Sequence, residues 1–201
     1  MIRLVVAEDQ TLLRLAICEL LERDPDLTVV ASCGRGDEVE ALVAEHQPDV
    51  AVLDIDMPGK TGLEAAEDLA QRGFATRVLM LTVFGRPGYL RRAMQNGAMS
   101  FLLKDSPPAV LIDAIKRTAA GERIVDPELA MVALSTGENP LTPREREVLR
   151  MSTSGASTQS LAGTLHLSEG TVRNTLSAAI QKLSAESRTE AARIAEDNGW
   201  L

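Results

Sequence analysis

The sequence lacks several features that would indicate particular classes of protein. Its two cysteines, Cys18 and Cys33, have no metal-binding spacing, so we expect reduced thiols. No apolar run approaches the roughly 18 residues of a membrane span, and we therefore expect a cytoplasmic protein without membrane insertion. One Trp, one Tyr and three Phe are too few aromatic residues for a surface that stacks single-stranded bases.

A basic excess is also missing, since the net charge is −8. The negative charge is unevenly distributed along the chain. Residues 139–201 hold seven basic and seven acidic side chains, so the whole acidic excess lies in residues 1–138. A chain that is acidic in its first part and balanced in its second indicates two units with different partners.

Five short apolar segments recur through the first 103 residues, and each is too short for a helix. They are nearly continuous in Val, Ile and Leu, which is typical of strands buried on both faces of a parallel sheet. Segments of helical period separate them. The pattern predicts an α/β fold, a doubly wound five-stranded parallel sheet. The expected strands are Ile2–Ala7, Leu27–Ala31, Val50–Leu53, Val78–Val83 and Phe101–Leu103.

The chain changes character after the fifth predicted helix, near Gly121. We expect a first domain over residues 1–121, a linker over 122–139 with one short helix after Pro127, and a small all-α domain over 140–201. The last domain opens with a capping box, in which Thr142 is the N-cap and Glu145 follows three residues later. Ser187 and Glu190 repeat that signature before the final helix.

Acidic, hydroxyl and basic side chains follow the predicted strands at their carboxyl ends. In a doubly wound sheet these ends meet at one edge, where ligands bind. Acids gathered in one crevice repel one another unless a divalent cation neutralises them, and a lysine with a hydroxyl can hold a phosphoryl oxygen. We expect a phosphoryl-transfer site in which an aspartate receives the group, built from Glu8, Asp9, Asp54, Asp56, Thr82 and Lys104.

The first 120 residues resemble the receiver domain of bacterial two-component response regulators, through Glu8-Asp9, Asp54 with Met57-Pro58 and Gly62, Thr82 and Lys104. The resemblance implies that a sensor histidine kinase phosphorylates Asp54. It also implies Mg²⁺ held by Asp9, Asp54 and the backbone carbonyl of Asp56, with Glu8 helping through water. Such a protein is a stoichiometric phosphoacceptor that loses the group slowly to water, and is not an enzyme.

The resemblance further implies a switch. Thr82 would bond the phosphoryl group, Lys104 would pair with it, and Phe101 would swing inward with Thr82. A phosphoryl group adds about −1.5 to −2 charges and three acceptor oxygens, so the loop after Thr82 must move. We expect this movement to reorganise the face around the fourth and fifth helices and to promote a homodimer.

A phosphohydrolase is the alternative for the first domain, because Asp54-Ile55-Asp56 after an apolar strand also resembles the haloacid dehalogenase-like phosphatases. There the first aspartate is the nucleophile and the second is a general acid. Three features count against it: the motif lies on the third strand, Pro58 occupies the position of the usual Thr or Val, and the pair Glu8-Asp9 lies upstream.

The second domain has helix-turn-helix proportions, with a short helix over 158–165, a tight turn, and a longer helix over 169–183. With Val172, Leu176 and Ile180 facing inward, polar side chains remain for DNA. Arginine reads guanine and asparagine reads adenine in the major groove, whereas Thr and Lys more often contact phosphates. The expected DNA-binding residues are Ser168 as the N-cap, Thr171, Arg173, Asn174, Thr175 and Lys182.

Residues 139–201 resemble the LuxR/FixJ-type DNA-binding domain through LTPREREVL, Leu167-Ser168, Thr171-Val172-Arg173, Lys182-Leu183 and Arg188-Thr189. Together with a receiver, this implies a phosphorylation-activated transcriptional regulator of the NarL/FixJ class that binds double-stranded promoter DNA as a dimer. RNA polymerase is a further candidate partner. The chain departs from the family pattern at Gln159-Ser160 and at Thr175, where lysine and glutamate, and histidine, are common.

A helical bundle that docks a protein or forms a dimer is the alternative for the second domain. Nucleic-acid-binding modules are usually basic, whereas this domain is neutral. A neutral domain can still bind DNA if its basic side chains share one face and a dimer doubles the contacts.

Overall fold

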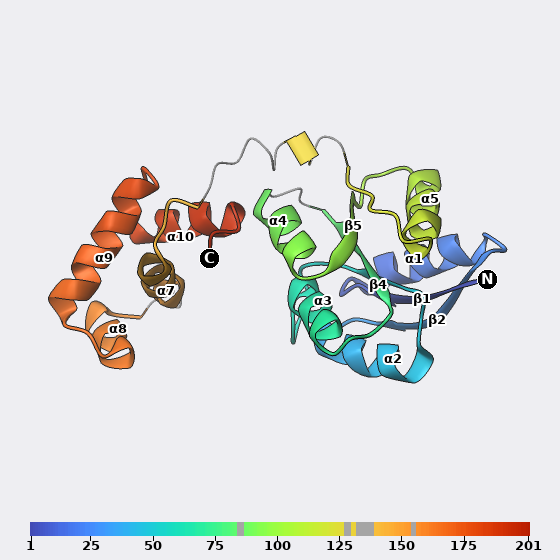
Figure 1. Ribbon diagram of the computed structural model, residues 1–201, viewed down its shortest axis with the longest axis horizontal. Coiled ribbons are helices and arrows are strands. Elements are labelled where there is room, and N and C mark those ends of the chain that lie inside the picture. The colour runs from blue at the N-terminus through green and yellow to red at the C-terminus, as the bar shows by residue number, and fades with distance from the viewer. Residues whose placement is uncertain (84–86, 127–129, 132–138, 154–155) are drawn as a thin grey trace. The chain divides into compact units, whose positions relative to one another are not determined.

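The chain forms two compact units in the computed structural model, and the first contains all five strands (Figure 1). The structure describes residues 1–83, 87–126, 130–131, 139–153 and 156–201. Within these residues, no helix is long and apolar enough to span a membrane. The short helix predicted after Pro127 falls largely outside the described residues.

The five strands form one parallel sheet in the order β2-β1-β3-β4-β5, which confirms the predicted doubly wound α/β fold. Because β1 lies beside both β2 and β3, the strand order reverses there, and the carboxyl ends of β1 and β3 flank a crevice. The strands are β1 (Ile2–Ala7), β2 (Leu27–Cys33), β3 (Val50–Leu53), β4 (Arg77–Thr82) and β5 (Ala98–Leu103).

Helices cover both faces of the sheet (Figure 1). Helices α1 (Thr11–Glu22) and α5 (Pro108–Ala119) share one core with side chains from β1, β3, β4 and β5. This packing buries Ile17 and Leu21 of α1 against the sheet, as their helical spacing predicts. The remaining helices of this unit are the 3₁₀ helix η1 (Gly36–Glu38), α2 (Val39–His46), α3 (Gly62–Gln71) and α4 (Pro87–Gln95).

Strand β5 begins three residues earlier than its apolar run predicts, at Ala98 instead of Phe101. The polar side chain of Ser100 interrupts the hydrophobic pattern, yet it is fully buried and hydrogen-bonded to Thr118 of α5. The first unit also continues beyond α5, because Phe101 and Val125 form an isolated parallel bridge. Residues 124–126, which the sequence places in the linker, therefore pair with β5.

The second unit consists of helices around a small apolar core that includes Val148, Leu161, Val172 and Leu176. The capping box at Thr142 is present as predicted, with hydrogen bonds in both directions between Thr142 and Glu145. Ser187 also caps its helix, but the Glu190 carboxylate accepts from the Glu186 amide. The described helices are α7 (Pro143–Ser152), α8 (Thr158–Leu165), α9 (Glu169–Lys182) and α10 (Arg188–Asp197).

Candidate functional site

Asp54 lies directly after β3, and only 5% of its surface is exposed. Its backbone amide donates to the carbonyl of Ala7, which joins the exits of β3 and β1. Its Oδ1 accepts a hydrogen bond of 2.8 Å from the Ile55 amide. A cavity of about 140 Å³ opens at this point and is lined by Asp9, Gln10, Asp54, Asp56, Thr82, Val83 and Lys104.

Gly62, the first residue of α3, allows this helix to begin against the loop that carries Asp54. A Cβ on Gly62 would lie 1.9 Å from the carbonyl oxygen of Asp54, a distance that no side chain can occupy. The Gly62 amide donates to the carbonyl of Ile55 at 2.9 Å. Any larger residue would therefore push the loop that carries Asp54 away from α3.

Lys104 bridges two acids in this crevice. Its Nζ lies 2.6 Å from Glu8 Oε2 and 3.0 Å from Asp54 Oδ2, and all three side chains are at least nine-tenths buried. Burial raises the pKa of Glu8 and of Asp54, although the lysine works in the opposite direction. Burial also opposes the charge on Lys104, but the two carboxylates outweigh it and raise the pKa of the lysine. Two acids thus share one cation.

Glu8, Asp9 and Asp54 form a cluster of the kind that holds a metal ion. One carboxylate oxygen from each lies within 4.8 Å of the others. Hard divalent cations such as Mg²⁺ bind through one or two carboxylates together with phosphate oxygens and water. Asp56, whose backbone carbonyl is the expected ligand, has an exposed side chain that lines the same cavity as Asp54.

Arg14, on α1, contacts the site although no sequence motif includes it. Its Nη1 donates a 2.6 Å hydrogen bond to the backbone carbonyl of Glu8, while the Glu8 amide donates to the carbonyl of Cys33. The Gln10 amide donates to the Glu8 carboxylate. Hydrogen bonds therefore fix both the backbone amide and the backbone carbonyl of Glu8. No motif signals this contact, because a single arginine in the first turns of a helix is common.

Thr82 and Phe101 are both buried, with exposures of 1% and 0%. Thr82 ends β4, and its carbonyl accepts a 2.8 Å hydrogen bond from the Lys104 amide. Phe101 pairs with Met80 across the sheet. The structure thus places the aromatic ring inward and joins the backbone of Thr82 directly to that of Lys104.

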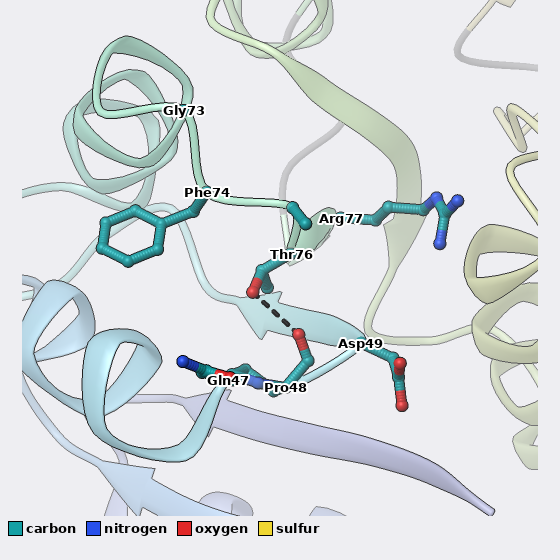
Figure 2. A pocket seen from close by; sticks show the side chains of 8 residues that line it. Gln47, Pro48, Asp49, Gly73, Phe74, Thr76 and Arg77 are labelled. Carbon is teal, nitrogen blue, oxygen red and sulfur yellow. Dashed lines mark hydrogen bonds between the residues drawn. The ribbon is translucent and has the colours of Figure 1, made fainter.

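A larger groove of about 500 Å³ lies at the opposite edge of the sheet, where β3 and β4 begin (Figure 2). The Thr76 hydroxyl donates to the Pro48 carbonyl at 2.7 Å across it. Among the described residues that line this groove, Asp49 is the single acid. The groove is therefore larger than the cavity at Asp54 but lacks its clustered charges.

Helix α9 exposes the side chains that the sequence assigns to DNA. Val172 and Leu176 are buried in the core of the second unit, whereas Thr171, Arg173 and Asn174 are exposed. Ser168 is the N-cap, and its Oγ accepts from the Thr171 amide. Thr175 is partly exposed, and its hydroxyl donates to the carbonyl of Thr171.

Lys182 has a different environment from the other residues assigned to DNA. Its Nζ lies 2.8 Å from Glu145 Oε2, the same oxygen that accepts from the Thr142 amide. Burial disfavours the charged carboxylate, but the hydrogen bonds from Lys182 and Thr142 outweigh it and hold the pKa of Glu145 below its usual range. Lys182 therefore ties α9 to the start of α7 and is less available to a phosphate than Arg173.

Two family models match the chain. Residues 4–116 match the response regulator receiver domain, and residues 139–195 match the bacterial regulatory proteins of the luxR family. The two matches cover the two compact units in turn. They agree with both resemblances drawn from the sequence motifs.

Relatives match over their full lengths. The chain is 45% identical over 201 residues to the uncharacterized transcriptional regulatory protein YvfU and 44% identical to the transcriptional regulatory protein DesR, both from Bacillus subtilis, with all of each chain covered. Among solved structures, the response regulator ChrA of a heme-sensing two-component system is 33% identical with a TM-score of 0.60. That match covers 100% of this chain and 98% of ChrA.

Proposed function

The chain belongs to the two-component response regulators with a LuxR-type DNA-binding domain and regulates transcription on phosphorylation, and we propose that Asp54 accepts the phosphoryl group. The observation that carries this proposal is the buried Asp54 carboxylate beside Lys104 at the small cavity. One carboxylate oxygen forms the new P–O bond while the P–N bond to the histidine of a sensor kinase breaks. The histidine nitrogen keeps the electron pair and takes a proton from solvent.

Mg²⁺ fits the acid cluster, since three carboxylate oxygens of Glu8, Asp9 and Asp54 lie close together and carry more negative charge than Lys104 neutralises. We assign Asp9, Asp54 and the Asp56 carbonyl as ligands, with Glu8 acting through water. The ion shields the charge of the incoming phosphoryl group when it is bound. Lys104 then pairs with a phosphoryl oxygen in place of the Asp54 carboxylate oxygen that it contacts in this structure.

Thr82 is the residue that bonds the phosphoryl group, and Phe101 responds through the sheet. The backbone carbonyl of Thr82 accepts a hydrogen bond from the Lys104 amide, so a shift of Thr82 at the end of β4 also moves Lys104 after β5. The receiver then favours a second copy of the chain, and the dimer presents two α9 helices to half-sites on promoter DNA. RNA polymerase is a further partner of the DNA-bound dimer, and these partners place the protein in the cytoplasm.

The receiver match favours a stoichiometric phosphoacceptor over the dehalogenase-like phosphatase. In the phosphatase, the second aspartate of the motif donates a proton to the leaving group. In the described part of the chain, the exposed Asp56 side chain lines the cavity at Asp54 but forms no ion pair with Lys104, which pairs with Glu8 and Asp54 instead. We therefore propose single labelling followed by slow loss of the phosphoryl group to water.

Arg173→Ala is expected to weaken promoter binding by about 1–3 kcal/mol, the cost of losing a base contact from a recognition helix. Arg193→Ala is a matched control, because Arg193 lies on α10, pairs with Asp197 at 3.6 Å and is 69% exposed. Arg173 pairs with Glu169 at 3.5 Å and is 68% exposed. Fluorescence anisotropy gives the dissociation constant of each phosphorylated variant for a selected genomic DNA fragment.

Equal losses for the two arginines would contradict the assignment of α9 as the DNA-reading helix. Binding that weakens only for Arg173→Ala supports it and disfavours the docking-bundle alternative. Labelling of Asp54 by a small phosphoryl donor is expected to be equal in both variants, since neither arginine lies in the receiver unit, and Arg193→Ala controls for the loss of a side chain in the second unit.

We propose a candidate surface for the dimer contact on α1 and α5, and the face around the fourth and fifth helices stays a prediction. Leu12, Leu15 and Val110 expose 84%, 59% and 44% of their surface on these two helices. An apolar groove of about 180 Å³ lies between α1 and α5. Like patches on two copies pair across a two-fold axis, which is the commonest arrangement of homodimers.

Leu15→Glu is expected to weaken the phosphorylated dimer by about 2 kcal/mol or more, because the contact would bury an unpaired carboxylate. Met131→Glu, at a residue 69% exposed outside α1 and α5, is the control and is expected to leave the dimer intact. Analytical ultracentrifugation of phosphorylated protein gives both dissociation constants. A dimer that tolerates Leu15→Glu would place the contact elsewhere.

A further inference from the structure

The chain that leaves α5 pairs with the outer edge of β5 at the residue assigned to the switch. The Phe101 amide donates to the Ile124 carbonyl at 2.8 Å, and the Asp126 amide donates to the Phe101 carbonyl at 3.3 Å. Val125, between them, forms the parallel bridge with Phe101. Both backbone polar groups of Phe101 on this edge are therefore taken by the segment that leads toward the second domain.

A buried chain of hydroxyl groups holds the same segment. The Ile124 amide donates to Ser100 Oγ at 3.2 Å, and Ser100 Oγ lies 2.7 Å from Thr118 Oγ1. Thr118 donates to the Ala114 carbonyl at 2.6 Å, so its only proton is used and Ser100 donates to Thr118. Ser100 and Thr118 are both fully buried. A buried hydroxyl is costly unless it is hydrogen-bonded, so the arrangement is specific.

These contacts connect residues 122–126, which we call the edge segment, to the switch residue Phe101. Phe101 cannot shift its backbone along or away from β4 without breaking the bonds to Ile124 and Asp126 or moving them with it. The edge segment also occupies the free edge of β5, an edge that is otherwise open for pairing with another strand. A movement of Phe101 is thus converted into a movement of the chain between the domains.

We propose that the edge segment transmits the state of Asp54 to the linker, and that Ser100 is the positioning residue that holds this segment on Phe101. The inference rests on the proposed function, because it assigns a path to the switch that Asp54 starts. In the unphosphorylated receiver the segment is docked. Phosphorylation displaces the Phe101 backbone, loosens the bonds to Ile124 and Asp126, and frees the linker to let the DNA-binding domains pair on DNA.

The test measures amide hydrogen exchange residue by residue by NMR, on the full chain with Mg²⁺, before and after addition of acetyl phosphate. The amides of Ile124 and Asp126 are expected to exchange at least tenfold faster in the phosphorylated wild type. They are expected to be unchanged in Asp54→Ala under the same conditions. Amides of β2, at the far edge of the sheet, report any general loosening.

Two variants separate positioning from packing. Ser100→Ala removes the acceptor of the Ile124 amide, whereas Thr118→Val keeps that acceptor and removes only the far hydroxyl. Ser100→Ala is expected to take up one phosphoryl group as wild type does. Its unphosphorylated form is expected to bind promoter DNA several-fold more tightly than wild type, so that phosphorylation adds correspondingly less. Thr118→Val is expected to keep most of the phosphorylation-dependent gain in DNA binding.

The outcomes are distinguishable. If intact mass shows no label on wild type, the proposed function fails and the inference falls with it. If Asp54 is labelled but Ile124 and Asp126 exchange at unchanged rates, the inference alone is overturned. An equal effect of Ser100→Ala and Thr118→Val on the gain in DNA binding would also overturn it, because loss of core packing would then explain both.

Discussion

Asp54→Asn is expected to abolish covalent labelling by acetyl phosphate or by a sensor kinase. The substitution keeps the shape of the side chain but replaces the carboxylate oxygen that forms the bond to phosphorus. Among the described residues, Glu8 is the other buried carboxylate that contacts Lys104, and it is not one of the residues that line the cavity. Intact-mass spectrometry with Mg²⁺ measures the fraction of chains carrying one phosphoryl group.

Asp56→Asn is the control for this prediction, and it is expected to retain labelling. The role assigned to Asp56 uses its backbone carbonyl, and its side chain is exposed. In a dehalogenase-like phosphatase the same substitution removes the general acid and stops turnover of a phosphate ester. Sustained hydrolysis that depends on Asp56 would therefore contradict the phosphoacceptor, as would label that remains on Asp54→Asn.

Lys104→Met is expected to destabilise the protein by about 3 kcal/mol at neutral pH in the absence of divalent cations. The substitution leaves Glu8 and Asp54 buried without the cation that both contact, and breaking a buried ion pair from one side costs roughly 3–5 kcal/mol. Mg²⁺ is expected to restore part of this loss, since it supplies positive charge to the same acids. Urea denaturation, followed at the unfolding transition of the receiver unit, measures the change in the free energy of unfolding.

Two further variants test the cause of that loss. Lys116→Met removes a lysine that is 34% exposed and pairs with Asp24 and Asp26, and it is expected to cost much less stability than Lys104→Met, because water screens an exposed ion pair. Adding Glu8→Gln to Lys104→Met removes one of the two stranded charges and is expected to recover stability. A double variant no more stable than Lys104→Met would show that lost packing, and not uncompensated charge, causes the effect.

Much of the fold and the gathering of the site could be predicted from the sequence, because both depend on local pattern and topology. Continuous runs of Val, Ile and Leu between helical segments specify a parallel sheet, and parallel strands bring their carboxyl ends to one edge. Asp54 and Lys104, which are 50 residues apart in numbering, therefore had to lie close together. The distance of 3.0 Å between Lys104 Nζ and Asp54 Oδ2 agrees with that reasoning.

The extent of β5 could not be predicted in the same way. Ser100 breaks the apolar pattern, and its burial depends on a hydroxyl partner on α5 that no local rule supplies. The pairing of the edge segment with Phe101 is equally hidden, since residues 122–126 have no strand pattern and their hydrogen bonds depend on the free edge of the sheet.

By itself, then, the sequence determined the family, the sheet, the two-domain order and the set of residues around Asp54, since these follow from periodicity, topology and motif. Only the tertiary structure decided the partners of the long charged side chains. Lys104 contacts Glu8 as well as Asp54, and Lys182 pairs with Glu145 on another helix. Flexible side chains have many rotamers of similar energy, so their partners depend on which acids the completed fold brings within reach.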